Sequence, residues 1–346
     1  MTNNFKLTPK ENYLRLAKGE CPEWVPFSSR AQHPRNTMAP NSMLIFPSWL
    51  NKDRTKEGGF DIWGIEYEAN YETNFGALPK PGKFMFDDVT KWHEYVKAPD
   101  YSDVDFELMA KRDLEAMPFF DPNQSALAIA THNGYFQNVM AFMGFTEGLL
   151  AMFEEPEAVL ELVMYMNDFY VPFAKKCMEA YNADIIDLGD DMATATDPFV
   201  SVEMYREMIK PAHAKHAAVG LDMGRYASMH NCGRCEDYLG DYVEMGITMW
   251  NPAQVSNDLK AVKAKFGNKL AISGGWEYQL PFTKEKLMQD EEMIRQSVRD
   301  VINTLAPGGG YCFTGGVMAL PGNELAPIVN QWVAEESIDL CLDFYK

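Results

Sequence analysis

The chain has 346 residues, of which 47% are hydrophobic and 13% aromatic, so it is suited to one large folded domain or two ordinary ones. Its formal net charge of −19 argues against nucleic-acid binding, and the lack of about 18 uninterrupted apolar residues argues against a membrane span. Six cysteines and an N-terminus without a secretory h-region predict a cytoplasmic protein with reduced thiols.

The N-terminal part begins with a helix and continues without clear periodicity. Thr8, Pro9 and Glu11 provide an N-cap, a proline at the first helical position and an acid two residues later, which predicts a helix start. A short strand is expected over residues 21–27. Residues 31–100 are rich in proline, glycine, asparagine and aromatic residues, and predict an irregular lid or insertion within a single domain spanning 1–346.

From residue 100 the chain alternates between predicted strands and helices. The strands are expected at 126–130, 183–188, 225–230, 247–250, 269–273 and 310–314. The helices are expected at 146–181 with a restart at Glu155-Pro156, at 201–220 ended by Gly220, and at 235–245, 257–266 and 284–305. This alternation predicts an α/β protein with a parallel sheet, most simply a (β/α)8 TIM barrel, with a doubly wound sheet as the alternative. Dinucleotide and P-loop glycine motifs are absent.

Polar residues collect at the predicted strand ends, where a (β/α)8 barrel places its chemistry. They are Ser28, Ser29 and Arg30; His132 and Asn133; Asp190 and Asp191; His230 and Cys232; Asn251 and Gln254; Trp276 and Glu277; and Cys312 with Thr314. A closed barrel would bring them to one mouth. Asp190 and Asp191 are alternatively loop caps, Asn251-Pro252 a turn, and Glu277 a solvated charge. His213 and His216, on an outer helix, are expected to be structural.

His230 and Cys232 form the sharpest feature. Residues two apart on an extended segment point the same way, so a zinc ion can take both side chains. Cys232 and Cys235 together form a Cys-x-x-Cys motif, so a thiol–disulfide redox site is an alternative to a metal site. Cys235 is also a candidate ligand.

Around these residues the chain resembles the uroporphyrinogen decarboxylase superfamily over nearly its whole length. The matching stretches are 61–64, 92–99, 143–148, 190–191, 204–211, 230–233, 251–254, 274–277 and 309–321. The resemblance implies a (β/α)8 barrel and two types of activity. The decarboxylases bind an acidic tetrapyrrole through an arginine-rich segment, which Arg30 alone does not reproduce. The other branch contains zinc-dependent methyltransferases that work with a corrinoid protein.

The resemblance to the methyltransferase branch implies a zinc site. Its ligands are a His-x-Cys pair, matched by His230 and Cys232, and a later cysteine that falls near Val317. Cys312, five residues earlier, is our predicted third ligand, with Cys235, Glu277 and Asp191 as alternatives. A changed ligand set predicts a substrate atom other than a thiol, such as an ether or alcohol oxygen.

The sequence therefore predicts a corrinoid-dependent methyltransferase that moves a methyl group from a methoxylated small molecule, in particular an aromatic methyl ether, to a cob(I)amide. Because no Asp-x-His-x-x-Gly motif is present, the corrinoid is expected on a small corrinoid-binding partner protein. The predicted roles are proton donation by Asp191 or Glu277, and substrate binding by Arg30, His132, Asn133, Asp190, Asn251, Gln254 and Trp276. The alternatives are a methylcobamide:thiol methyltransferase, a small-acid decarboxylase, and a non-catalytic corrinoid-protein-binding module.

Overall fold

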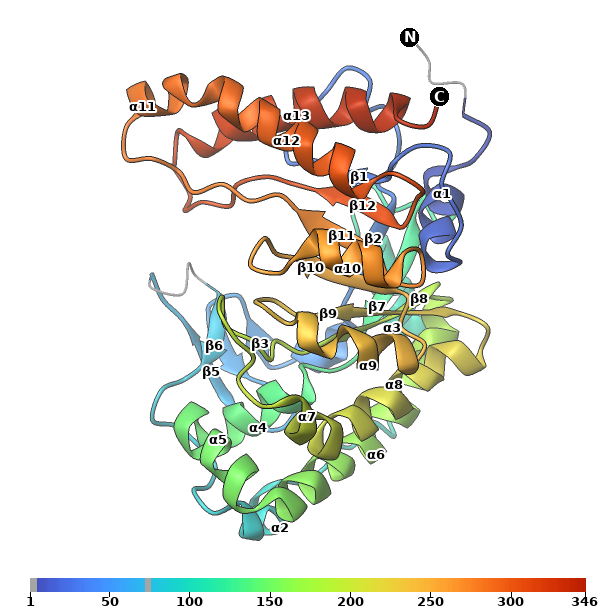
Figure 1. Ribbon diagram of the computed structural model, residues 1–346. Helices are drawn as coiled ribbons and strands as arrows, with labels where there is room; N and C mark the ends of the chain where they lie inside the picture. Colours follow the sequence, from blue (N-terminus) through green and yellow to red (C-terminus); the bar gives the residue numbers. More distant parts are fainter. Residues whose placement is uncertain (1–4, 72–75) are drawn as a thin grey trace.

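The computed structural model describes residues 5–71 and 76–346, and a parallel sheet of eight strands forms its centre (Figure 1). In spatial order the strands are β1 (Phe27–Ser28), β12 (Tyr311–Thr314), β11 (Ala271–Gly275), β10 (Met249–Ala253), β9 (Tyr226–His230), β8 (Ile185–Gly189), β7 (Ala126–Ala130) and β2 (Ser42–Ile45). The sheet curls around a cavity that is lined by residues of all eight strands. The predicted α/β class and parallel sheet are confirmed.

The sheet has a seam between β1 and β2. These strands follow one another in the sequence but lie at the two ends of the strand order, and no backbone ladder joins them within the described residues. A side-chain contact bridges them instead, because the Asn41 amide donates a hydrogen bond of 2.5 Å to the Phe27 carbonyl oxygen. The structure therefore shows a curled parallel sheet, and not the completely paired (β/α)8 barrel that we expected.

Helices pack on the outside of the curled sheet and across one of its ends. Those before β8 are α1 (Pro9–Ala17), α2 (Trp92–Tyr95), α3 (Phe106–Glu115), α4 (Tyr135–Met143), α5 (Phe145–Glu154) and α6 (Pro156–Tyr181). Those after it are α7 (Val202–Met208), α8 (Lys210–Asp222), α9 (Leu239–Glu244), α10 (Leu259–Phe266), α11 (Lys284–Gln289), α12 (Glu291–Leu305) and α13 (Ala326–Asp343). Short 3₁₀ turns are η1 (Ser48–Asn51), η2 (Val89–Lys91) and η3 (Glu236–Tyr238).

Most of the expected helix boundaries are confirmed, and two helices differ. Thr8 and Glu11 form the capping box of α1, and Pro156 starts α6. The segment 201–220 is two helices that meet at Ile209, and Gly220 lies inside α8 instead of ending it. Gly220 serves close packing there, since an added Cβ would lie 2.7 Å from the Ile186 side chain.

The segment 31–100 is more regular than its sequence predicts. It contains β2 of the central sheet and a small antiparallel sheet of β3 (Arg54–Thr55), β4 (Gly58–Phe60), β5 (Glu66–Ala69) and β6 (Ala77–Pro79). Residues 72–75 of this segment lie outside the described residues. Strands of two to four residues are too short to show a readable alternation, so the sequence does not reveal them.

Helix α1 closes the end of the sheet at which the strands begin. Leu16 and Ala17 of α1 pack in one apolar cluster with Ala126, Ile185 and Met249, together with Ala128, Ala271 and Cys312. This cluster forms the bottom of the central cavity. The opposite end, where the strands finish, carries the polar residues that the sequence singles out.

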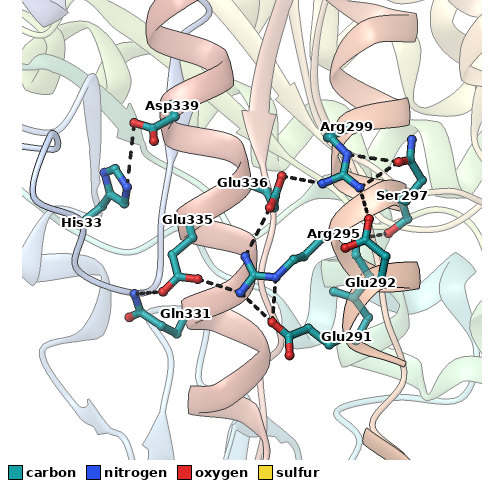
Figure 2. A network of polar contacts seen from close by, with 12 residues as sticks. His33, Glu291, Glu292, Arg295, Ser297, Arg299, Gln331, Glu335, Glu336 and Asp339 are labelled. Atoms are coloured by element: carbon teal, nitrogen blue, oxygen red, sulfur yellow. Dashed lines mark hydrogen bonds and ion pairs between the residues drawn. The ribbon is translucent and has the colours of Figure 1, made fainter. Parts of the chain in front are cut away.

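The helices α12 and α13 lie side by side and are joined by ion pairs (Figures 1 and 2). Arg295 of α12 lies 2.7 Å from Glu335 and 3.3 Å from Glu336 of α13, while Arg299 lies 2.8 Å from Glu336. Charged groups shared among several partners hold their geometry better than isolated surface pairs. Within the described residues, no helix is both long and apolar enough to traverse a bilayer.

Candidate active site and metal centre

A cavity of about 1150 Å³ lies inside the curled sheet. Eight of the predicted site residues line it, namely Arg30, His230, Cys232, Asn251, Gln254, Trp276, Glu277 and Cys312. Arg30 and Glu277 are exposed, so they mark the mouth. The strand-end residues therefore do converge, which follows from the shared direction of the parallel strands.

Asp191, His230 and Cys232 form a compact group of possible metal ligands. One ligand atom from each residue lies within 4.8 Å of the other two. The His230 Nε2 atom is 3.6 Å from the Cys232 Sγ atom and 3.9 Å from the Asp191 Oδ1 atom. Imidazole nitrogen, thiolate sulfur and carboxylate oxygen are the donors that zinc binds, and three protein ligands leave a fourth position open.

The His230 ring is held from behind by Asn251. The Nδ1 atom of His230 lies 2.7 Å from the Asn251 Oδ1 atom, an acceptor, so Nδ1 carries the hydrogen. The lone pair is then on Nε2, the atom that faces Cys232 and Asp191. Metal-binding histidines have this arrangement, with the second ring nitrogen donating to a fixed oxygen.

The charge around Cys232 also suits a cation. Burial, and then the carboxylates of Asp191 and Glu277, raise the pKa of the Cys232 thiol to about 12. The backbone N–H of Cys232 donates to Asp191 at 2.6 Å, which fixes this carboxylate beside the thiol. A site that gathers carboxylates around a thiol has negative charge to share with a metal ion.

The other cysteines lie apart from this group. Cys312 packs in the apolar cluster below the cavity, so the structure brings Asp191, and not Cys312, to His230 and Cys232. Cys235 is buried, and its thiol contacts the Asn231 carbonyl oxygen. Both thiols of the Cys-x-x-Cys motif are free and have a pKa raised to about 12 by burial, which does not favour the thiolate that redox exchange needs.

Asp190 lies behind the sheet and binds the start of α4. Its carboxylate accepts from the backbone N–H groups of Tyr135, Phe136 and Gln137 at 2.9, 2.9 and 3.0 Å, and lies 3.1 Å from His213 Nε2. These contacts face away from the cavity. The contacts match the alternative, a capping role, although the helix that Asp190 caps precedes it in the chain. Substrate binding by Asp190 stays a prediction.

His132 and Asn133 are likewise absent from the cavity lining. The His132 ring is buried, accepts from the Gly134 backbone N–H at 2.8 Å, and stacks on Tyr135. Burial lowers its pKa well below the usual value, so the ring is neutral. Since the ring contacts other parts of the outer layer, the structure does not place it where it would touch a substrate.

His213 and His216 belong to the same buried network, as expected for structural residues. His216 lies 2.8 Å from the Thr131 hydroxyl and 2.9 Å from the Tyr135 hydroxyl. Burial, and then the neighbouring His213, lower the pKa of His216 to about 3. Neither histidine is near the metal-ligand group found in the described residues.

Gln254 and Trp276 line the cavity in fixed positions. The Gln254 Oε1 atom accepts from the Gly233 backbone N–H at 2.5 Å, next to Cys232. The Trp276 ring is buried, and its Nε1–H donates to the Ser297 hydroxyl at 2.9 Å. A ring held in this way offers a rigid wall to a flat ligand.

Sequence reasoning missed the residues deep in the cavity. Asp187, Ser228 and Tyr13 all line it, and Asp187 is only 5% exposed. A signal for Asp187 was present, because it is a charged residue inside the apolar strand Ile185–Gly189. Tyr13 lies on α1, and its position depends on tertiary packing.

Comparisons with known proteins are limited but consistent. The profile of the family described as Uroporphyrinogen decarboxylase (URO-D) matches residues 123–329. A solved structure of a methyltransferase from Methanosarcina mazei is similar in fold, with a TM-score of 0.59 at 15% sequence identity, over 99% of this chain and 100% of that chain. A search of curated proteins found no match.

Proposed function

Since this chain belongs to the uroporphyrinogen decarboxylase family, we propose that it is a zinc- and corrinoid-dependent methyltransferase that demethylates a methoxylated small molecule. The observation that carries the proposal is the group of Asp191, His230 and Cys232 at the cavity. The similarity in fold to a methyltransferase supports the reaction class. An aromatic methyl ether suits the cavity, whose wall includes the Trp276 ring.

His230, Cys232 and Asp191 would hold the zinc ion, and Asn251 would hold His230. A zinc ion held there would supply Lewis-acid activation of the ether oxygen, which would make the departing group a better leaving group. A corrinoid on a small partner protein would supply the acceptor of the methyl group. The ligand set differs from our prediction in its third member, because Asp191 takes the place of Cys312.

Glu277 is the remaining proton donor at this site. Asp191 faces the thiol and the imidazole as a ligand, whereas Glu277 is exposed at the mouth and close enough to influence the Cys232 thiol. A carboxyl group there can give a proton to the oxygen that loses its methyl group. Arg30 and Gln254 line the entrance beside it.

Decarboxylation of a polycarboxylate is less well supported by the cavity. Among the described residues, Arg30 is the one arginine that lines it, no lysine does, and Asp187 and Glu277 add negative charge. Several substrate carboxylates would need several cations.

The proposal is tested by measuring zinc and methyl transfer in the same preparations. The protein should contain one zinc ion per chain, and Cys232→Ala and His230→Ala should lose it. With cob(I)alamin and a methoxylated aromatic compound, the wild type should form methylcobalamin. Cys235→Ala, a matched loss of a nearby thiol, should keep its zinc. Unchanged zinc in Cys232→Ala, or no methylcobalamin from any ether, would contradict the proposal.

A further inference from the structure

The inside of the curled sheet is open because its inward residues are small. Ala128, Ser228 and Ser273 occupy positions where (β/α)8 barrels usually place bulky branched side chains. The cavity therefore extends below the metal-ligand group, down to the apolar cluster under α1. A ligand at the metal site has room to continue into the sheet.

The deepest polar part of this cavity consists of Tyr13, Ser42, Asp187 and Ser228, which we call the cavity floor. Asp187 and Ser228 are Cα partners on neighbouring strands, and the Ser228 hydroxyl donates to the Asp187 carboxylate. The Asn251 amide also hydrogen-bonds Asp187, and the Tyr13 hydroxyl pairs with the Ser42 side chain. The cavity floor thus contains two hydrogen-bonded pairs, Asp187 with Ser228 and Tyr13 with Ser42.

Asp187 has no cationic side chain in the cavity floor. Burial raises the pKa of this carboxyl group, and the His230 imidazole acts in the opposite direction. A carboxylate has about four acceptor positions, and Ser228 and Asn251 occupy two of them. The remaining positions can accept from a ligand, and a buried acceptor gains most from a partner that donates.

We propose that the cavity floor binds the distal end of the substrate through a hydrogen-bond-donating group, a hydroxyl or a protonated amine, and rejects a carboxylate. This inference rests on the proposed function, because it places the methoxy end of the same molecule at the metal-ligand group. Asp187 accepts from the distal group, while Ser228 holds Asp187 in place. A carboxylate would bring only acceptor atoms to a carboxyl group, in a part of the cavity that holds no cationic side chain among the described residues.

Three probes that share a methoxy end test this selectivity by calorimetric titration in the absence of any corrinoid. They are 4-methoxybenzyl alcohol, 4-methoxybenzylamine and 4-methoxybenzoate. The alcohol and the amine should bind at least about tenfold more tightly than the benzoate, because each can donate a hydrogen bond to the Asp187 carboxyl group and the benzoate carboxylate cannot. Tighter binding of the amine identifies a cationic group, and tighter binding of the alcohol a neutral one.

Variants of matched size locate the effect. Asp187→Asn should remove the discrimination against benzoate, and Ser228→Ala should weaken it by a smaller factor. Ser273→Ala is the control, because it deletes the same hydroxyl two strands away, where Ser273 pairs with Thr314 instead of Asp187. Circular dichroism checks that each variant is folded, and its zinc content checks that it binds the metal.

The outcomes separate this inference from the proposed function. Three outcomes would overturn the cavity-floor proposal, even if methyl transfer proceeds. They are equal affinities for all three probes, no binding of any probe, and equal effects of Ser273→Ala and Ser228→Ala on the affinities. A preference that depends on Asp187, without methyl transfer from any probe, supports the cavity floor and refutes the proposed reaction.

Discussion

A single amide, that of Asn251, determines which nitrogen of His230 faces the other two ligands. Its Oδ1 atom accepts the Nδ1 hydrogen, and its nitrogen side is turned toward the carboxylate of Asp187, which can only accept when ionised. The amide therefore has one orientation that satisfies both neighbours. This arrangement leaves the lone pair of Nε2 directed toward Cys232 and Asp191, as the proposed metal site requires.

Replacing Asn251 by alanine should lower zinc affinity about 10- to 100-fold, because outer partners of metal-binding histidines contribute about this much. Competition with a chromogenic chelator measures the affinity. Thr314→Val, another change in the cavity wall, should leave the affinity within about twofold of the wild type. Equal affinities for Asn251→Ala and the wild type would show that the ring needs no such support.

The protonated Cys232 thiol predicts how zinc binding depends on pH. Since the pKa of the thiol is raised to about 12, the group holds its proton at pH 8, and zinc binding must displace it. The apparent affinity should rise about tenfold per pH unit from this proton alone. Calorimetry in buffers of different ionisation enthalpy should show about one proton released, and Cys232→Ser should release none.

The pairing of His230 with Cys232 was predictable from the sequence, whereas Asp191 was only one of several candidates for the third position beside them. His230 and Cys232 follow from strand geometry alone, because their spacing matches the two-residue period of an extended chain. Asp191 follows another strand, and its distance from them depends on how β8 and β9 lie together. The position of Asp190 could not be predicted for the same reason. It is next to Asp191 in the sequence, but its carboxylate contacts the start of α4 and does not line the cavity.

At the scale of the element, helix α4 begins without a cap of its own. Gly134 is its N-cap residue, so no side chain there accepts from the first turn, and the three N–H groups are satisfied by Asp190. The φ of Gly134 is 85°, and an added Cβ would lie 2.4 Å from the Asp190 carboxylate. Glycine is therefore required where α4 meets the end of β8.

Asp190→Ala should lower the free energy of unfolding by about 3 kcal/mol, because it leaves three buried N–H groups and His213 without their partner. Urea unfolding of the metal-free protein measures the loss. Asp191→Ala, the same substitution one residue later, should cost about 1 kcal/mol, since it removes one backbone contact. A similar small loss for both variants would mean that Asp190 is not the cap that the geometry indicates.

The elements of regular length were the predictable part of the fold. Every strand expected after residue 100 is present, because short, mostly apolar runs between turn signals are distinctive. The break at Asp290 was missed because no glycine or proline lies there to end a helix. The break at Ile209 did have a signal, because Pro211 stands in the first turn of α8. The two-residue strand β1 exists only through its pairing with β12.

For the molecule as a whole, the seam between β1 and β2 is where the curled sheet is least secured. Asn41→Ala would remove the contact to the Phe27 carbonyl oxygen. Backbone amides at 27–28 and 42–45 should then exchange about tenfold faster with deuterium, since local opening costs less free energy there. The amides of β9 serve as the internal reference. If exchange became faster throughout the protein, or did not become faster at the seam, Asn41 would not be what secures the seam.

The pairing of β1 with β12 also affects how the chain can fold during its synthesis on the ribosome. Phe27 and Ser28 leave the exit tunnel early, yet their partners Phe313 and Thr314 are translated after every other strand of the sheet. The first strand to be synthesised is thus among the last to be paired, and its exposed edge must wait through nearly all of translation. A chain of this topology depends on its early residues remaining soluble until its late ones emerge.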